Sequence, residues 1–299
     1  MRQEAYFCTV KELDELGKNN IPRQLISHTH LIYSSPATLA FNSPGAEGFG
    51  VKRAGLAVPD SVMLIVSPGC CGRNTSVLSS MRAYQDRFYY LLMDETDIVT
   101  GRHLKKIPKA VAEICEGLKK KPSVVMICIT CVDALLGTDM ERVCHKAEEY
   151  AGVPVRPCYM YALTREGRKP PMVHVRQSVY SLLEPKKKKG NVVNLLGYFS
   201  PLTDDCELYD LLHGAGVKTI HEISRCKDYA QYQTMSEANF NLVLHPEARF
   251  AAEDFHDRLK IPYIELRRLY QIDKIASQYR AFAAALGVEF EDEIPRKAA

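Results

Sequence analysis

Apolar runs of strand length, each followed by a helical pattern, constrain the fold of this chain most strongly. The runs "SVMLIV" (61–66) and "SVVMICIT" (123–130) are continuous rather than alternating, as expected of strands that are covered on both faces. In the second half, "NVVNLLGY" (191–198) and "NFNLVLHP" (239–246) repeat this pattern. Because helical segments separate the runs, their order indicates an α/β fold with parallel sheets flanked by helices.

The helical segments are recognised by the spacing of their apolar residues and by their end residues. "IPKAVAEICEGLKKK" (107–121) ends in lysines, and "DALLGTDMERVCHKAEEYAG" (133–152) ends in a glycine. The segment "SVLSSMRAYQDRFYYLLM" (76–93) is also compatible with a helix. The remaining predicted elements are helices over 204–216, 249–259 and 273–287, and strands over 153–160, 217–224 and 261–267.

The chain is long enough, at 299 residues, for two domains of ordinary size. We predict two Rossmann-like domains, residues 46–185 and 191–292, preceded over 1–45 by a helix and an extended N-terminal arm. The lysine run 186–189 between them is interpreted as a solvated linker. The loop "LLGYFSPLTDD" has one glycine instead of a glycine-rich phosphate fingerprint, so nucleotide binding by this chain is not expected.

Composition excludes several classes of protein. The net charge of +3 is too small to indicate nucleic acid, and no apolar stretch reaches membrane-spanning length. We therefore expect a cytoplasmic protein that binds neither nucleic acid nor membrane. In that compartment the ten cysteines would stay reduced, so a disulfide framework does not explain them. Each is either a small buried hydrophobe or a potential metal ligand.

Three cysteines follow the buried runs of the first half. Cys70 and Cys71 come after the first run, and Cys131 follows the second, where the carboxyl ends of parallel strands gather ligands. Iron–sulfur clusters are usually held by four thiolates. One chain offers two or three, so a second chain would supply the others. The alternative is that these cysteines are core residues, as Cys128 within its strand is expected to be.

These motifs resemble those of the nitrogenase component 1 family. The segments "SPGCCGRNTS", "DETDIVTGRHLKKIPKAVAEI" and "ICITCVDALLGTDMERV" are similar to the first domain of that family. Its members include the dark-operative protochlorophyllide and chlorophyllide reductases and the nickel-sirohydrochlorin reductive cyclase. The second half is similar in order and spacing, so the resemblance covers residues 43 to 290. It implies a shortened form without the family's third domain.

The resemblance implies a bridging iron–sulfur cluster between two subunits. Its second and third ligand positions map to Cys71 and Cys131, and Ala46 occupies the position of the first. A [4Fe-4S] cluster is therefore expected instead of an eight-iron centre, and Cys70 could stand in for the absent thiol. The partner subunit would be a second copy of this chain or a paralogous chain.

The resemblance also implies a cofactor pocket in which His245 and His174 are candidate ligands. In "NLVLHP" (241–246), His245 comes after the N-L-V of a strand, at the position of a cofactor-binding cysteine of the family, and His174 lies near the family's pocket histidines. A second metallocofactor or a tetrapyrrole-like ligand would fit there. The alternative is that both are hydrogen-bonded histidines at strand ends.

Two charged segments lie between the cysteine motifs. The acidic residues Asp94, Glu95 and Asp97 are interpreted as a solvated turn. Arg102 and His103, in "TGRHL", could line the same side of the sheet as the cysteines.

The resemblance implies a reductase subunit. In this hypothesis an ATP-dependent iron–sulfur reductase passes low-potential electrons to the cluster, which relays them to an unidentified substrate or cofactor. An alternative within the family is a scaffold on which a metallocofactor is assembled and handed on. A third hypothesis is a metal-free two-domain protein that binds a small molecule, with the cysteines in its core.

Overall fold

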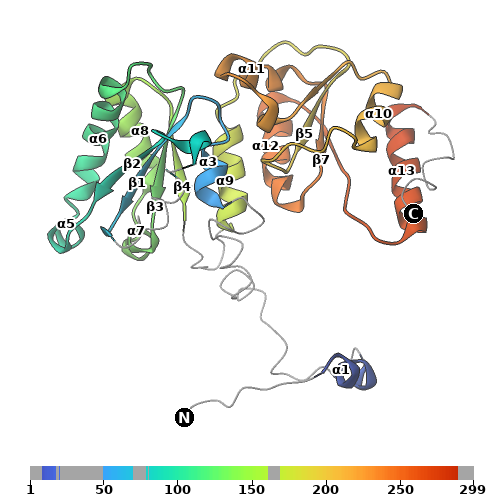
Figure 1. Ribbon diagram of the computed structural model, residues 1–299, viewed down its shortest axis with the longest axis horizontal. Helices are drawn as coiled ribbons and strands as arrows, with labels where there is room; N and C mark the ends of the chain where they lie inside the picture. Colours follow the sequence, from blue (N-terminus) through green and yellow to red (C-terminus); the bar gives the residue numbers. More distant parts are fainter. Residues whose placement is uncertain are drawn as a thin grey trace.

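The chain folds around two parallel sheets of four strands each (Figure 1). The computed structural model describes residues 9–17, 20, 50–69, 79, 81–160 and 169–288. The predicted α/β class and its two Rossmann-like sheets are confirmed. The predicted extended arm lies outside the described residues, and α1 (Val10–Leu16) is the described helix that precedes it.

The first sheet has the strand order β2-β1-β3-β4. Its strands are β1 (Val62–Ser67), β2 (Phe88–Leu92), β3 (Val125–Ile129) and β4 (Val155–Tyr159). All residues of β1 and β3 are buried, which explains why both read as continuous apolar runs.

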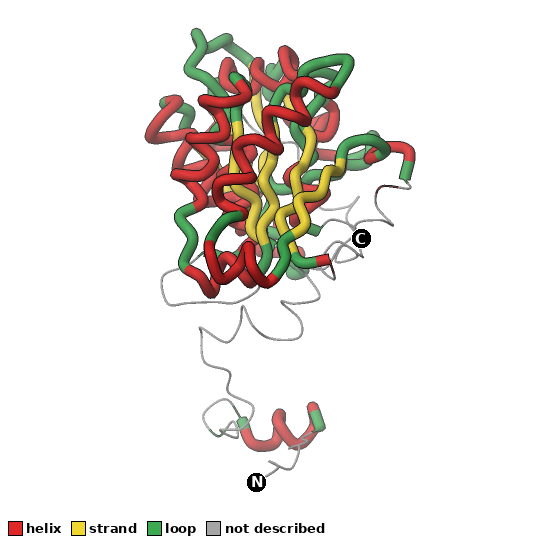
Figure 2. Tube along the Cα trace, turned by 90° about the vertical axis from the view of Figure 1, so that its left-hand side faces the viewer, coloured by secondary structure: helices red, strands yellow, loops and turns green. Residues whose placement is uncertain are grey.

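Helices cover both faces of this sheet. Alternate residues of β1 and β3 pack with α6 (His103–Gly117) and α8 (Met140–Ala151) on the outer face. The other residues pack with α3 (Val51–Gly55) and α9 (Pro171–Tyr180) on the inner face. Seen from the side of the first sheet, the strands run behind the outer layer of helices (Figure 2).

The second sheet repeats this arrangement with the order β6-β5-β7-β8. Its strands are β5 (Val192–Leu196), β6 (Thr219–His221), β7 (Phe240–Val243) and β8 (Tyr263–Glu265). One face packs against α10 and α13, and the other against α11 and α12. These helices span Glu207–Gly214 (α10), Tyr229–Gln233 (α11), Arg249–Leu259 (α12) and Ile272–Leu286 (α13).

Two predicted elements differ from the structure, and some of the observed helices were not predicted. Within 76–93, predicted as helical, residues Phe88–Leu92 form strand β2, because an aromatic-rich segment pairs in parallel with β1. The helix predicted over 133–152 is two helices, α7 (Cys131–Leu136) and α8, separated at Gly137, whose φ of 69° ends the first. Helix α9 was not predicted, because burial on most sides removes its amphipathic spacing.

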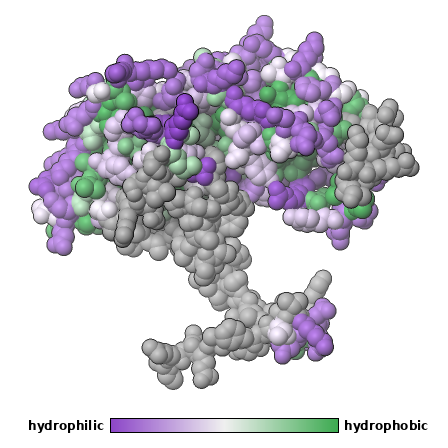
Figure 3. Space-filling model, in the orientation of Figure 1, coloured by the Kyte–Doolittle hydropathy of each residue, from purple (hydrophilic) through white to green (hydrophobic). Residues whose placement is uncertain are grey.

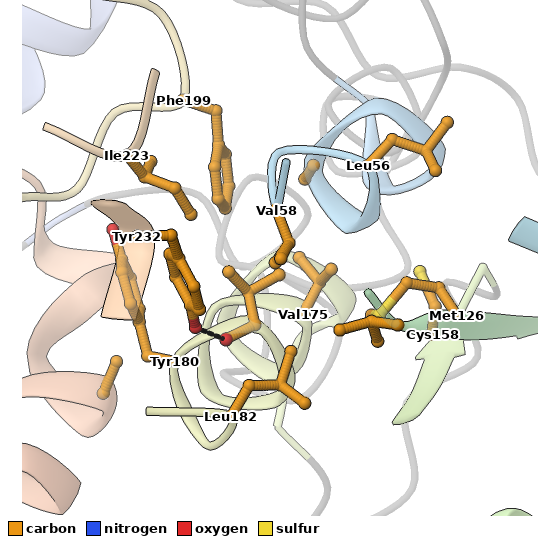
Figure 4. Packing of buried hydrophobic residues seen from close by; sticks show 14 of the residues in the cluster. Leu56, Val58, Met126, Cys158, Val175, Tyr180, Leu182, Phe199, Ile223 and Tyr232 are labelled. Atoms are coloured by element: carbon orange, nitrogen blue, oxygen red, sulfur yellow. Dashed lines mark hydrogen bonds between the residues drawn. The ribbon is translucent and has the colours of Figure 1, made fainter. Parts of the chain in front are cut away.

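A single hydrophobic core joins the two sheets through α3 and α9. It includes Val175 of α9, Tyr232 of α11 and Phe255 of α12. Figure 4 shows Tyr180 and Tyr232 side by side in this core, where the Tyr232 hydroxyl donates to the Val179 carbonyl oxygen at 2.5 Å. A buried hydroxyl needs such a partner. The predicted boundary between the two domains, at 185–191, lies beside this shared core. This boundary stays a prediction.

The face of the molecule shown in Figure 3 is largely polar. On the face shown in Figure 3, hydrophilic side chains cover most of both halves, and apolar residues are scattered among them. Among the described residues, no helix combines the length and the apolar character that a membrane span requires.

Candidate functional site

The carboxyl edge of the first sheet brings the two cysteine-bearing segments together. β1 is hydrogen-bonded to both β2 and β3, and Val66 pairs with Ile129 at the last rung between β1 and β3. The chain continues from β1 to one neighbour and later returns to the other, so the β1/β3 boundary is a topological switch point. The segments that begin at Pro68 and Cys131 therefore leave the same edge from adjacent strands.

The three predicted cysteine ligands differ in how far the structure describes them. Cys131 is the first residue of α7, and its backbone lies directly beyond β3. Cys70 and Cys71 lie outside the described residues, which resume at Ser79. The ligand set therefore stays a prediction. Within the described ranges no three histidine, cysteine or acidic side chains are grouped to hold a metal ion.

Two buried hydroxyl groups lie at this edge. Ser67 ends β1 and Thr130 follows β3, so they occupy the rung after the Val66–Ile129 pair. Ser67 is 0% exposed and Thr130 is 1% exposed. Within the described ranges, neither hydroxyl oxygen has a hydrogen-bond partner. An unpaired buried polar group typically costs about 1–3 kcal/mol, so these two atoms are unusual.

A buried histidine–aspartate pair fixes α7 against α6. His103 Nε2 lies 2.9 Å from Asp133 Oδ1, and both side chains are almost fully buried. His103 Nδ1 lies 3.0 Å from the carbonyl oxygen of Asp97, which can only accept, so Nδ1 carries a proton. A second proton must lie between Nε2 and Oδ1. His103 was predicted to line the same side of the sheet as the cysteines. Its hydrogen bond to Asp133 of α7, the helix that begins with Cys131, agrees with that prediction.

The acidic segment before α6 is not a solvated turn at Asp97. Asp94 caps α5 (Glu95–Thr100) by accepting from the Asp97 N–H at 2.6 Å. The Asp97 carboxylate is buried and accepts from Lys106 Nζ and Arg102 Nε, each at 2.7 Å. These two cations hold the pKa of Asp97 well below its usual range. The expectation of a solvated turn was wrong at Asp97. Lys106, nine residues later on α6, supplies the positive charge that allows this carboxylate to be buried.

The carboxyl edge of the second sheet places Gly197 against His245. β5 pairs with β6 on one side and β7 on the other, so this is a second switch point. Gly197 follows β5 with a φ of 134°, and a Cβ there would lie 2.7 Å from the His245 backbone nitrogen. Any side chain would clash, so glycine is required.

His245 lies two residues after β7, close to the predicted position. Its Nδ1 accepts from the Glu247 N–H at 3.3 Å, and its ring meets that of Tyr198 edge-on at 5.7 Å. The side chain is 23% exposed. The imidazole is therefore oriented by its neighbours and open to solvent at this edge.

Arg176 connects this edge to α9. Its guanidinium donates to the Gly197 carbonyl oxygen through Nη2 at 2.7 Å and Nε at 3.1 Å, and Nη1 donates to the Met172 carbonyl oxygen at 2.9 Å. Nη1 also pairs with Glu247 Oε2 at 2.7 Å. The Arg176 side chain is 5% exposed. Sequence reasoning missed this residue, although an arginine within the apolar segment "PPMVHVRQSVY" is a signal.

His174 lies on the same helix in different surroundings. It is within α9 and not at a strand end, it packs edge-on against Tyr159 at 4.3 Å, and its Nδ1 lies 3.3 Å from Ser178 Oγ. Burial, and then the charge of Lys169, lower the pKa of His174 to about 4. The imidazole is therefore neutral at pH 7, which is the form that can bind a metal.

This depressed pKa makes stability depend on pH. Between pH 6.5 and 4 the unfolded chain binds a proton at His174 that the folded chain does not bind, so stability falls as the pH falls through this window. In His174→Gln this loss should be smaller by about 2 kcal/mol, after allowance for solvent screening. Urea unfolding at several pH values measures it. His145→Gln, at an exposed position, is the control, and equal slopes in both variants would contradict the prediction.

Comparison with known proteins identifies the family. A family model described as nitrogenase component 1 type oxidoreductase matches residues 47–299. The chain belongs to this family. The predicted resemblance to nitrogenase component 1 is thereby confirmed.

Several curated relatives of this nitrogenase component 1 type chain share one name. The nitrogenase iron-molybdenum cofactor biosynthesis protein NifE of a Nostoc species is 27% identical over 239 residues, which are 77% of this chain and 49% of the relative. That of Klebsiella pneumoniae is 26% identical over 266 residues, which are 82% of this chain and 58% of the relative. The chain thus spans about half the length of these relatives.

A solved structure has the same fold. Nitrogenase Cp1 at pH 6.5 aligns with a TM-score of 0.61 at 17% identity, over 83% of this chain and 58% of that one. At this identity the likeness concerns the fold alone.

Proposed function

We propose that this chain is a subunit of a metallocofactor assembly scaffold that binds an iron–sulfur cluster at the carboxyl edge of its first sheet. The observation that carries the proposal is the pairing of β1 with β3, which starts both cysteine segments at one edge. The relatives named as iron-molybdenum cofactor biosynthesis proteins support assembly more than electron relay.

The proposed cluster is a [4Fe-4S] cluster held by Cys71 and Cys131, with Cys70 as a further ligand. Such a cluster supplies sulfur-bound iron at low potential. Because four thiolates are usual, two or three from one chain require a partner, either a second copy or a paralogous subunit. The unpaired hydroxyls of Ser67 and Thr130 support the fit, since a polar group at this edge would give both a partner.

A second metallocofactor or a tetrapyrrole-like ligand is proposed at a site that includes His245 and His174. His245 is oriented at the switch point of the second sheet, and His174 is neutral at pH 7 because of its lowered pKa. His174 packs against Tyr159 at the end of β4, and His245 packs against Tyr198 beyond β5, so a ligand held by both histidines would contact both halves of the chain.

The second candidate function is an electron-relaying reductase. The family description as an oxidoreductase favours it. In that case an ATP-dependent iron–sulfur reductase would dock on the dimer and supply electrons. Transfer of a cluster to an apo acceptor protein without turnover supports the scaffold, whereas turnover that requires the reductase and ATP supports the relay.

Cluster binding is tested by anaerobic reconstitution with iron and sulfide. The parent should become brown, with about four iron and four sulfide ions per dimer. Cys71→Ala and Cys131→Ala should each lose most of the bound iron. Cys144→Ala, which changes a buried cysteine of the outer core, is the control and should retain it.

A colourless parent after reconstitution would contradict the proposed cluster and favour the metal-free binding protein. Retention of iron by both ligand variants would contradict the ligand assignment.

A further inference from the structure

Ser67 and Thr130 place two buried hydroxyls, neither with a partner in the part of the chain that the structure describes, on one face of the first sheet. Side chains alternate along a strand, and Met63 and Ile65 of β1 point into the inner core, as does Cys128 of β3. Ser67 and Thr130 continue these two rows, so both point to the inner face at neighbouring positions.

The local fold offers these hydroxyls no hydrogen-bond acceptor among the described residues. The buried hydroxyl of Ser61, which directly precedes β1 at its opposite end, does have one: Ser61 Oγ donates to the Val58 carbonyl oxygen at 2.7 Å. A hydroxyl can rotate to donate to any acceptor that comes within reach. The burial of two unsatisfied donors at one edge therefore indicates an acceptor supplied by something other than these residues.

We propose that Ser67 and Thr130 donate hydrogen bonds to sulfur atoms of the iron–sulfur cluster and raise its reduction potential. This inference rests on the proposed cluster site. Both residues lie at the edge from which the cysteine segments start, and Thr130 directly precedes Cys131. A hydrogen bond to sulfur stabilises the more negative, reduced cluster more than the oxidised one, so its loss lowers the potential.

The test is a dye-mediated redox titration of the reconstituted protein, followed by electron paramagnetic resonance. Thr130→Val and Ser67→Ala should each shift the midpoint potential to a more negative value, and the double variant should shift it further. Thr130→Ser keeps a hydroxyl and should restore a potential close to that of the parent.

Two further measurements separate this role from a structural one. Because neither hydroxyl has a hydrogen-bond partner among the described residues, Thr130→Val should leave the melting temperature of the cluster-free protein unchanged or raise it. In D2O, exchangeable deuterons coupled to the cluster should be detected by pulsed electron–nuclear double resonance in the parent and be weaker in each single variant. Ser224→Ala is the control, since Ser224 Oγ is a buried hydroxyl without a described partner in the second half.

The outcomes distinguish this inference from the proposed function. A parent that binds a cluster whose potential and deuteron couplings are the same in Ser67→Ala, Thr130→Val and Ser224→Ala would overturn the hydrogen-bond assignment alone. A parent that binds no cluster would overturn both.

Discussion

Arg176→Met is expected to destabilise the protein by about 3 kcal/mol, because it removes the donor for the Gly197 and Met172 carbonyl oxygens and the partner of Glu247. These groups lie where α9 meets the second sheet, and water cannot readily replace a guanidinium that is 5% exposed. The change in the free energy of unfolding is measured in urea.

Arg249→Met provides the matched control for this change. Arg249 also pairs with a glutamate, Glu265, but its side chain is 42% exposed. Exposed ion pairs contribute about 0–1 kcal/mol. Equal losses in the two variants would show that burial of Arg176 has no energetic consequence.

Gly197→Ala is expected to cost about 3 kcal/mol or more. The φ of 134° is unfavourable for alanine, and the new Cβ would lie 2.7 Å from the His245 nitrogen, so β5 or β7 would have to shift. Gly117→Ala is the control, because a Cβ at the end of α6 has no neighbour within 4 Å. That change should be neutral or stabilising by up to about 1 kcal/mol.

Nuclear magnetic resonance can locate the effect of Gly197→Ala. If the backbone moves only near β5 and β7, the resonances of the His245 ring should change, whereas those of His145 on α8 should not. A variant as stable as the parent would contradict the close approach of the two loops.

Elements with a strong local signal were predictable from sequence. The helix predicted over 249–259 has the observed bounds of α12, β3 lies within its predicted run, and β1 extends one residue, Ser67, beyond the run predicted over 61–66. In each case the apolar pattern, continuous in the strands and amphipathic in the helix, is compatible with only one type of secondary structure. β2 was not predictable in this way, because its edge pairing with β1 depends on a partner more than twenty residues away.

The same distinction applies to the candidate sites. The edge location of Cys131 and His245 could be predicted, since each follows a strand whose apolar run is readable. The His103–Asp133 pair could not, because it joins residues thirty positions apart. The unsatisfied state of Ser67 and Thr130 could not be predicted either, since it depends on which acceptors the folded chain fails to bring near.

The core that runs through α3 and α9 has a thermodynamic consequence for the whole molecule. Because Val58 and Val175 pack in one cluster with Phe199 and Phe255, neither half can lose its interior without exposing that of the other. Heating in a calorimeter should therefore give one endotherm for both halves, with a van't Hoff enthalpy equal to the calorimetric value. The spacing between the two carboxyl edges would then be set by packed side chains, and no hinge would vary it during a reaction cycle.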